Sequence, residues 1–239
     1  MARRERLDKT LAAAGVGTRK EVRALIKQGR ISVDGEIVLD PAAHVDPERS
    51  EIFVDALPLA RGTMTFMLNK PAGVVTAARD ASHPTVLDLF PEPLARRLFP
   101  AGRLDKDTEG LLIVTSDGDL CHRLISPRHG VEKEYLARLD GNLDPGIARR
   151  FADGIALKDG TVTRPARLDI VSPGPEPVAR VIVTEGKYHQ VKRMFAACGL
   201  GVTALKRVRI GSLRLDESLE PGAYRELSES EIALLLVNP

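Results

Sequence analysis

A polar turn that leads directly into a short apolar run is the feature that most constrains this chain. Residues 102–110 read Gly-Arg-Leu-Asp-Lys-Asp-Thr-Glu-Gly, and residues 111–115 read Leu-Leu-Ile-Val-Thr, followed by a turn signal at Asp117-Gly118. This order predicts a loop, a buried strand and a turn. Asp105 is therefore expected at the mouth of a core strand, where a rigid scaffold beneath a polar loop can hold a catalytic group.

Two other interpretations of this turn stay open. Asp and Thr are common in turns and helix caps, so Asp105 alone is compatible with a purely structural role. The spacing of Asp105, Asp107 and Glu109 also matches the first half of a calcium-binding loop. The twelfth position of such a loop is Ser116 rather than Glu, and the flank is strand-like, which argues against calcium.

The composition is that of an ordinary globular protein. The 239 residues are 43% hydrophobic and 28% charged, which allows a full core and argues against disorder. Cys121 and Cys198 lie 77 positions apart without metal-ligand spacing, so neither a disulfide framework nor a metal site is expected. No run has the apolar length of a signal peptide or membrane span, and we expect a cytoplasmic protein.

The charge is unevenly placed along the chain. The whole chain carries +2, but residues 1–30 hold nine Lys and Arg against three acids, a net +6 that leaves −4 for the remainder. Such a basic segment predicts an anionic partner, with nucleic acid as the leading candidate. The alternative is a helix face that is merely solvated.

The basic segment predicts two short helices followed by a hairpin. The first helix ends at Gly15, and Thr18 with Glu21 forms a capping box that starts the second. Residues 31–39 then predict a hairpin that turns at Asp34-Gly35. The cations expected to contact RNA from this segment are Arg6, Lys9, Arg19, Lys20, Arg23, Lys27 and Arg30.

This segment resembles the S4 RNA-binding domain over about residues 5 to 55. The resemblance rests on Arg6-Leu-Asp-Lys and Gly29-Arg-Ile-Ser-Val-Asp-Gly. It implies that a basic helical surface contacts the RNA backbone, which positions the protein without reading sequence.

A linker is expected between Asp55 and Thr63, where the hydrophobic spacing fits neither a helix nor a strand. Residues 1–60 thus form an S4 domain with its linker, and residues 61–239 form a second domain.

A helix predicted from His189 places Lys192 off its buried stripe, next to Arg193 in the first turn. Because cations there oppose the helix dipole, an anion is expected to face them, either RNA phosphate or a loop carboxylate.

Five ordered motifs together resemble the pseudouridine synthases, and most of all the subfamily that carries an S4 domain and modifies ribosomal RNA. They are Lys70-Pro-Ala-Gly, Gly102 to Leu112, Glu132-Lys-Glu-Tyr-Leu, Glu185-Gly-Lys-Tyr-His-Gln-Val-Lys-Arg-Met-Phe and Leu205 to Gly211. The resemblance spans nearly the whole chain. It implies an α+β protein in which a small S4 domain precedes a catalytic domain with a large mixed, mainly antiparallel sheet and a central cleft.

The resemblance also implies which residues form the site. Asp105 matches the catalytic aspartate of the family, and Tyr135 matches its active-site aromatic residue. Lys192 matches the cation that pairs with the aspartate, although a neighbouring subfamily carries the bidentate Arg there. Leu205 matches an apolar wall of the uracil pocket. Further contacts with RNA are expected from Arg103, Arg128 and Arg193.

The implied reaction breaks the N-glycosidic bond of uridine, turns the base and rejoins it to the ribose through C5. It needs no redox change and no external group, so no cofactor is expected. A carboxylate beside C1′ acts as a nucleophile or removes a ribose proton, and a nearby cation favours its ionised form. The base must leave its stack for a pocket with an aromatic face and basic surroundings.

Five stretches are most similar to family members that act on small-subunit (16S) ribosomal RNA: Phe66-Met-Leu-Asn-Lys-Pro, His83-Pro-Thr-Val-Leu, Ser126-Pro-Arg-His, Lys192-Arg-Met-Phe-Ala-Ala and Leu219-Glu-Pro-Gly-Ala-Tyr-Arg-Glu-Leu. We expect a monomer that modifies this RNA, free or within an assembling subunit. The alternatives are a large-subunit (23S) enzyme with the same core and a non-catalytic RNA-binding assembly factor. A glycosidase is disfavoured, because Asp105 and Asp107 lie too close in sequence to flank a glycosidic bond.

Overall fold

The structure is a computed structural model that describes residues 4–59, 62–144 and 146–239. The basic residue Arg3 and the expected linker residues 60–61 lie outside this set. Within the described ranges, no helix has the length and apolar character needed to cross a membrane.

Contacts divide the chain into two compact units. The smaller comprises Met1–Met64 with Phe90–Leu98, and the larger comprises Thr65–Leu89 with Phe99–Pro239. The segment Phe90–Leu98 contains helix α3 (Glu92–Ala95) and belongs to the smaller unit, although a linear split at residue 60 assigns it to the second domain. Phe90–Leu98 belongs to the smaller unit because its contacts are with residues far earlier in the sequence.

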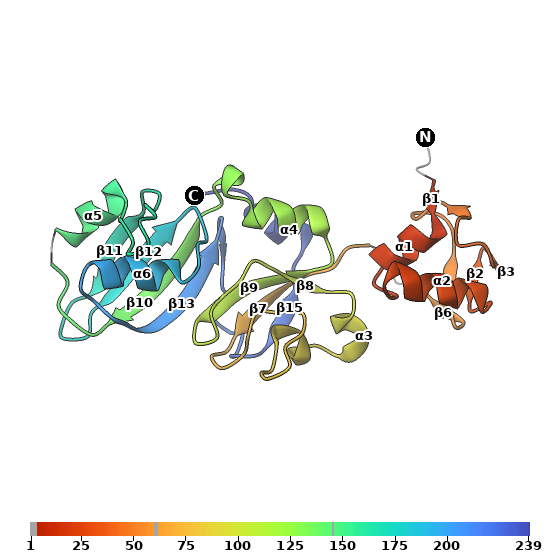
Figure 1. Ribbon diagram of the computed structural model, residues 1–239, viewed down its shortest axis with the longest axis horizontal. Coiled ribbons are helices and arrows are strands. Elements are labelled where there is room, and N and C mark those ends of the chain that lie inside the picture. The colour runs from red at the N-terminus through yellow and green to blue at the C-terminus, as the bar shows by residue number, and fades with distance from the viewer. Residues whose placement is uncertain (1–3, 60–61, 145) are drawn as a thin grey trace. The chain divides into compact units, whose positions relative to one another are not determined.

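Two helices, α1 (Leu7–Ala13) and α2 (Arg19–Lys27), pack together in the smaller unit (Figure 1). The capping box at the start of α2 is confirmed, because Thr18 Oγ1 accepts from the Glu21 N–H and the Glu21 carboxylate accepts from the Thr18 N–H. The buried core residues of this unit are Leu7, Leu11, Val22, Ile26, Ile31, Val45 and Ile52.

The strands of the smaller unit are short. They are β1 (Glu5–Arg6) paired with β4 (His44–Val45), and a sheet of β3 (Glu36–Ile37), β2 (Ile31–Val33), β5 (Ile52–Val54) and β6 (Leu57–Pro58) in that order. The hairpin at Asp34-Gly35 is confirmed. Leu57–Pro58 was expected within the linker but belongs to the sheet. The turn before this strand has φ values of 50° at Asp55 and 64° at Ala56. Such a turn usually contains Asp-Gly, and because Ala56 stands in place of the glycine, the sequence does not indicate the turn.

The larger unit is built on one mixed sheet. Its strands in spatial order are β11 (Arg167–Ser172), β12 (Val178–Val183), β10 (Lys133–Leu139), β13 (Val202–Ile210), β9 (Glu109–Thr115), β7 (Thr65–Lys70) and β15 (Tyr224–Glu226), with β14 (Leu213–Arg214) beside β13 and β8 (Phe99–Ala101) beside β9. Among the described strands, β13 and β9 run parallel and the other neighbours are antiparallel. The expected mixed, mainly antiparallel sheet is confirmed.

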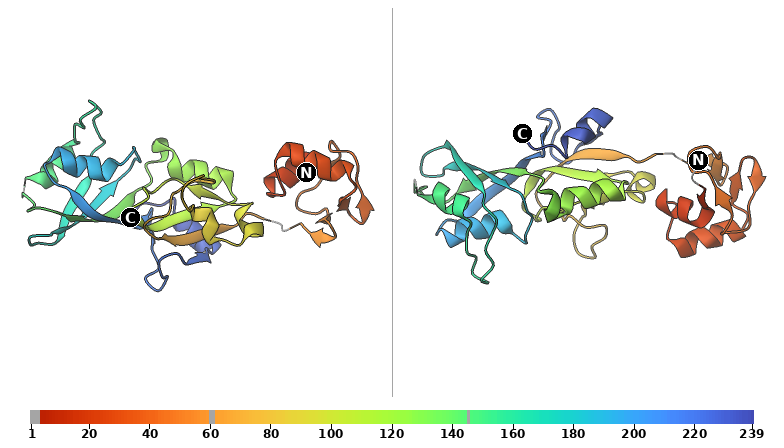
Figure 2. Two further views of the ribbon diagram at one scale, coloured as in Figure 1. Left: turned by 60° about the horizontal axis from the view of Figure 1, so that its bottom comes forward. Right: turned by 90° about the horizontal axis from the view of Figure 1, so that it is seen from above.

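Helices cover both faces of this sheet. Helices α4 (Gly118–Ile125) and α6 (Gln190–Ala197) lie on one face, and α7 (Glu229–Leu234) lies on the other (Figure 2). Helix α5 (Ile147–Asp153) contacts β11.

Two hydrophobic cores flank the middle of the sheet in the larger unit. The first packs Phe151 and Phe195 against the strands β10 to β13, and their ring centroids are 5.0 Å apart. The second packs Leu124 of α4 against Met67 and Ile113. Strand β13 contributes to both cores, so the two halves of the sheet meet along it and β9.

Gly110 makes the parallel junction possible. It pairs with Arg207 across β9 and β13 and has a φ of +97°. A Cβ atom at this position would lie 2.2 Å from the carbonyl oxygen of Arg207. Only glycine fits both the left-handed backbone and the close approach of the two strands.

Candidate active site

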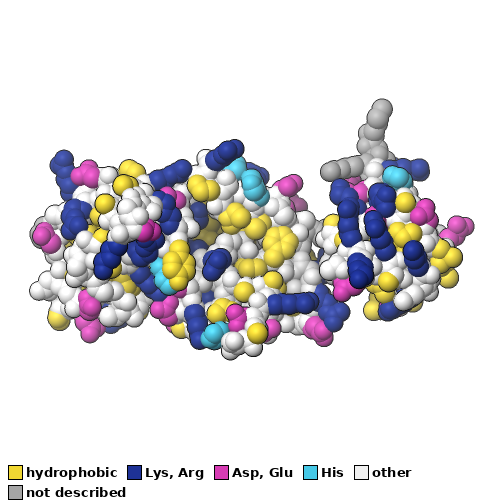
Figure 3. Space-filling model, in the orientation of Figure 1, with side chains coloured by type: hydrophobic (Ala, Val, Ile, Leu, Met, Phe, Trp, Pro, Cys, Tyr) yellow, Lys and Arg dark blue, Asp and Glu magenta, His cyan; other side chains and the backbone are white. Residues whose placement is uncertain are grey.

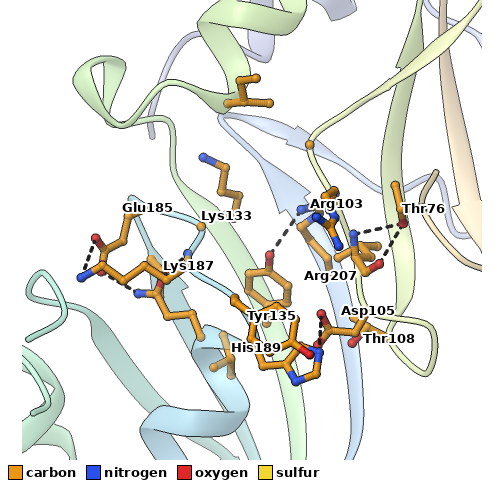
Figure 4. A pocket seen from close by; sticks show the side chains of 18 of the residues that line it. Thr76, Arg103, Asp105, Thr108, Lys133, Tyr135, Glu185, Lys187, His189 and Arg207 are labelled. Carbon is orange, nitrogen blue, oxygen red and sulfur yellow. Dashed lines mark hydrogen bonds and ion pairs between the residues drawn. The ribbon is translucent and has the colours of Figure 1, made fainter. Parts of the chain in front are cut away.

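A cavity of about 560 Å³ lies in the larger unit, where a central cleft was expected. One side is lined by the segment from Pro100 to Asp105 and by Thr108, and the other by side chains of β10, β13 and the start of α6 (Figure 4). Its volume is typical of sites that bind small ligands. Members of both cores line the cavity, so side chains from both halves of the sheet meet in it.

Asp105 lies in the turn that precedes β9 and points into the cavity toward His189 (Figure 4). The Thr108 N–H donates to the carbonyl oxygen of Asp105 over 3.1 Å, which closes the turn. The Asp105 side chain is 24% exposed. The carboxylate is thus shielded from bulk water and still reachable from the cavity.

Lys70 anchors this turn from beneath. Its side chain is fully buried, and Nζ donates to the carbonyl oxygens of Pro71, Lys106 and Thr108 over 2.9, 3.3 and 2.8 Å. Burial lowers the pKa of Lys70 to about 8, although nearby carboxylates act in the opposite direction. The three carbonyls replace the water shell of the ammonium, and those of Lys106 and Thr108 tie the backbone that follows Asp105 to β7.

Two side chains from the start of α6 face the two carboxylate oxygens of Asp105. Lys192 Nζ is 3.3 Å from Oδ2, and His189 Nε2 is 3.4 Å from Oδ1. Lys192 also contacts Asp107 over 2.5 Å, and this hydrogen bond is the main cause that lowers the pKa of Asp107. Loop carboxylates therefore compensate the cation that the first turn of α6 disfavours.

Tyr135 and Arg207 are direct neighbours across β10 and β13. Arg207 Nη1 donates to the Tyr135 hydroxyl over 3.3 Å, and Nε donates to the carbonyl oxygen of Leu111 over 2.7 Å. Arg207 is 3% exposed, and its Nη2 has no hydrogen-bond partner among the described residues. Leu205, two residues earlier on the same face of β13, is buried and lines the cavity.

The other cations predicted in the larger unit lie in different environments. Arg103 is exposed and lines the cavity. Arg128 is exposed in a 3₁₀ turn over Pro127–His129, outside the described cavity lining. Arg193 donates to the carboxylate of Asp159 over 2.5 Å and is partly buried. The structure therefore brings Arg103, but not Arg128, to the cavity.

In the smaller unit, Lys and Arg side chains gather over α1 and α2 (Figure 3). Arg6 and Arg23 both donate to the buried Asp8, and the hydrogen bond from Arg6 is the main cause that lowers the pKa of Asp8 to about 2. The other ion pairs are Lys9 with Glu5 and Arg30 with Asp55. The exposed cations of α2 that form no ion pair within the described residues are Arg19, Lys20 and Lys27.

Sequence reasoning gave no role to three side chains that contact the site. Lys70 and His189 stand within motifs used for the family resemblance. His189 precedes Lys192 by three positions, which places both at one end of a helix and was a usable signal. Arg207 follows Leu205 by two positions on a strand, so both point to the same face of the sheet.

Comparisons with known proteins agree with this geometry. The family model described as RNA pseudouridylate synthase matches residues 64–197, and the S4 domain model matches residues 5–49. A Bacillus subtilis protein named uncharacterized RNA pseudouridine synthase YtzG is 44% identical over 233 residues, which cover 96% of this chain and 98% of the relative. The ribosomal small subunit pseudouridine synthase A of Escherichia coli (strain K12) is 46% identical over 231 residues, or 95% and 98% of the two chains.

A solved structure shows the same fold. The crystal structure of a pseudouridylate synthase is similar with a TM-score of 0.70 and 40% sequence identity, and it covers 96% of this chain and 99% of its own. The chain belongs to the RNA pseudouridylate synthase family. It is a pseudouridine synthase with an N-terminal S4 domain, as the sequence motifs predicted.

Proposed function

We propose that this enzyme isomerises uridine to pseudouridine in small-subunit ribosomal RNA and that Asp105 acts on the ribose of a flipped-out nucleotide. The observation that carries the proposal is the position of the Asp105 carboxylate, which faces the cavity between Lys192 and His189. The Escherichia coli relative, named for the small subunit and 46% identical, supports the choice of RNA.

In the proposed reaction, Asp105 works as a carboxylate. It adds to C1′ or removes a ribose proton, while the C1′–N1 bond breaks and its electron pair leaves with the base. The base turns and C5 bonds to C1′, and at this stage the bond between Asp105 and C1′ breaks or the ribose regains the proton that Asp105 removed. The C5 proton is then released and N1 is protonated. The positive charge of Lys192 faces the Asp105 carboxylate over 3.3 Å, and the buried Lys70 holds the turn in place.

The rest of the cavity receives the base. The ring of Tyr135 provides an aromatic face and Leu205 an apolar wall, and both line the cavity with Asp105. Base flipping requires such a pocket, because a base that leaves its stack no longer packs against its neighbours. A base that fills the cavity displaces water from it, which strengthens the interaction of Asp105 with Lys192.

We assign RNA binding to two groups of cations, one in each unit. In the smaller unit, Arg19, Lys20 and Lys27 are exposed and available to phosphates, whereas Arg6, Lys9, Arg23 and Arg30 are already held by carboxylates. In the larger unit, Arg103 and Arg128 are exposed, while Arg193 is held by Asp159. The enzyme is proposed to act as a monomer in the cytoplasm, on free RNA or on an assembling small subunit.

Release of tritium from uracil C5 tests the proposal. Small-subunit ribosomal RNA labelled at C5, free and partly assembled, is incubated with the wild type and with Asp105→Asn, and large-subunit RNA serves as the comparison. We expect release from small-subunit RNA by the wild type alone, with RNA affinity equal in the two proteins. Release only from large-subunit RNA would overturn the assigned target, and equal release by Asp105→Asn would overturn the role of Asp105.

A further inference from the structure

Tyr188 and His189 form a stacked aromatic pair at the cavity. Their ring centroids are 3.8 Å apart and their planes differ by 18°. Both residues line the cavity, yet Tyr188 is 70% exposed. Because one face of the Tyr188 ring covers His189, its exposure comes from the opposite face and the edges. An aromatic face of this size, open to solvent beside a base pocket, lacks a partner in the described protein.

The backbone holds this pair in an unusual conformation. His189 has a φ of 48°, in the left-handed region that non-glycine residues rarely adopt. The loop is fixed because the Gln190 side chain accepts from the Lys187 N–H over 2.9 Å and donates to Glu185 over 2.9 Å. Strained backbone that is held by its surroundings in this way is typical of functional sites.

The strained conformation directs the histidine ring to the proposed catalytic carboxylate. His189 Nε2 is 3.4 Å from Asp105 Oδ1, while the flat side of the same ring lies against Tyr188. One face of Tyr188 is therefore used by His189, and the opposite face remains open to a planar ligand.

The surroundings of Tyr188 are suited to a polyanion. Arg193 Nη1 donates to the carbonyl oxygen of Tyr188 over 3.4 Å, and Lys187 precedes it in the same loop, although these two cations also pair with Asp159 and Glu185. Arg103 is exposed on the opposite lining of the cavity. An aromatic face among cations is the combination that binds single-stranded RNA, since bases stack while phosphates pair.

We propose that the open face of Tyr188 is a stacking subsite for the nucleobase next to the target uridine. The inference rests on the proposed function. When a uridine enters the cavity, its neighbour in the chain loses a stacking partner, and Tyr188 lies where a flanking base can replace that interaction. Stacking tolerates any base, so the subsite supports binding without reading sequence.

Substitutions at Tyr188 test the subsite, because loss of a binding contact should raise KM and leave kcat nearly unchanged. Tyr188→Phe keeps the ring, whereas Tyr188→Leu and Tyr188→Ala remove it. We expect KM to rise roughly 10-fold or more with Leu and Ala, little change with Phe, and kcat within about 3-fold in each variant. The matched control is Ile170→Ala on β11, which removes an apolar side chain that is 48% exposed and outside the described cavity lining. Equal KM values for Tyr188→Ala and the wild type would overturn the subsite.

A binding measurement separates this inference from the proposed function, because it needs no turnover. The probe is a short single-stranded RNA with one uridine flanked on each side by 2-aminopurine, whose fluorescence falls when it stacks. The wild type and Asp105→Asn should quench the probe in a saturable manner, and Tyr188→Ala should need about 10-fold more protein. Equal quenching by Tyr188→Ala contradicts the subsite, whereas quenching without tritium release from any ribosomal RNA contradicts the proposed function alone.

Discussion

Arg207 faces Tyr135 across β13 and β10, and its buried guanidinium donates to the tyrosine hydroxyl over 3.3 Å. Within the part of the chain that the structure describes, no carboxylate forms an ion pair with Arg207. A buried charge without an opposite charge beside it destabilises a protein by several kcal/mol, so a purely structural role does not account for this cation. The cavity beside it is the proposed place where a uracil ring carries negative charge after the C1′–N1 bond breaks.

Replacing Arg207 should therefore slow the chemical step. We expect Arg207→Met to lower kcat by about 100-fold or more, the loss typical for one electrostatic group at a reacting centre, while RNA affinity changes little. Arg207→Lys should retain part of the rate because it keeps a charge. Single-turnover kinetics with saturating enzyme measure this effect directly.

A second buried arginine on the same strand is the control. Arg209 is 2% exposed, but it donates to Glu134 and Glu132 over 2.7 and 2.9 Å. Arg209→Met removes the shortest ion pair of the buried Glu134 and leaves it the longer contacts with Arg180 and Arg214, so it should lower the free energy of unfolding by about 1.5 to 3 kcal/mol. If Arg207→Met likewise lost stability while its folded fraction kept the wild-type rate, the electrostatic role would be wrong.

Because Lys70 is buried, the free energy of unfolding of the larger unit should depend on pH in the alkaline range. Its pKa is about 8 in the folded protein, against 10.5 for a lysine side chain in water. Between these values the unfolded chain binds a proton that the folded chain has released, so the free energy of unfolding rises with pH. Below pH 8, Lys70 is charged in both the folded and the unfolded chain, and the cost of burying its charge lowers the free energy of unfolding in full.

The test compares urea unfolding of the wild type and Lys70→Met from pH 7 to 10. The wild type should gain up to about 1.4 kcal/mol per pH unit more than the variant over the window between pH 8 and 10. Lys133, whose pKa burial also lowers to about 8, keeps its own contribution in both proteins. Parallel pH profiles would show that the ammonium of Lys70 is not desolvated as the structure implies.

Gly110 is expected to tolerate no side chain. Gly110→Ala places a Cβ 2.2 Å from the backbone of β13 at a φ of +97°, so the strands β9 and β13 must separate. We expect a loss of more than about 2 kcal/mol in the free energy of unfolding, together with lower activity, because the two halves of the cavity move apart. Thermal and urea unfolding measure the first effect.

The matched control is Gly222→Ala. Gly222 has a φ of +90°, but a Cβ there would meet nothing within 4 Å. This variant should show only the cost of the left-handed backbone, about 1 kcal/mol. Equal losses at the two glycines would mean that strand separation adds nothing at Gly110.

Local sequence patterns predicted the parts of the fold that depend on neighbouring residues. The capping box at Thr18 and the buried strand after Asp105 follow from side chains within a few positions. Such patterns failed where the deciding contact is distant. Between residues 140 and 178, for example, the described residues form one strand of the sheet, β11, and an isolated bridge between Ala156 and Val162.

The site itself could not be assembled from local patterns. Asp105, Tyr135 and Lys192 meet because β13 pairs with β10 on one side and with β9 on the other. Strand order and register are set by long-range packing, which a single sequence does not specify, so the family resemblance supplied these residues. The resemblance paired Lys192 with Asp105, and the structure adds Asp107 as a second partner that no local pattern indicated.

The cations of the smaller unit should divide into two classes when they are replaced by Gln. Arg19, Lys20 and Lys27 are exposed and form no ion pair with a described residue, so replacing them removes phosphate binding and little stability. The slope of log K against log salt should then fall by about 0.7 to 0.9 for each phosphate that the protein no longer neutralises, with kcat unchanged at saturating RNA. By contrast, Arg23→Gln weakens the hold on the buried Asp8 and should lower the stability of this unit. Binding measured from low to high salt decides the matter: an unchanged slope in the triple variant would show that this face of α2 does not bind the RNA backbone.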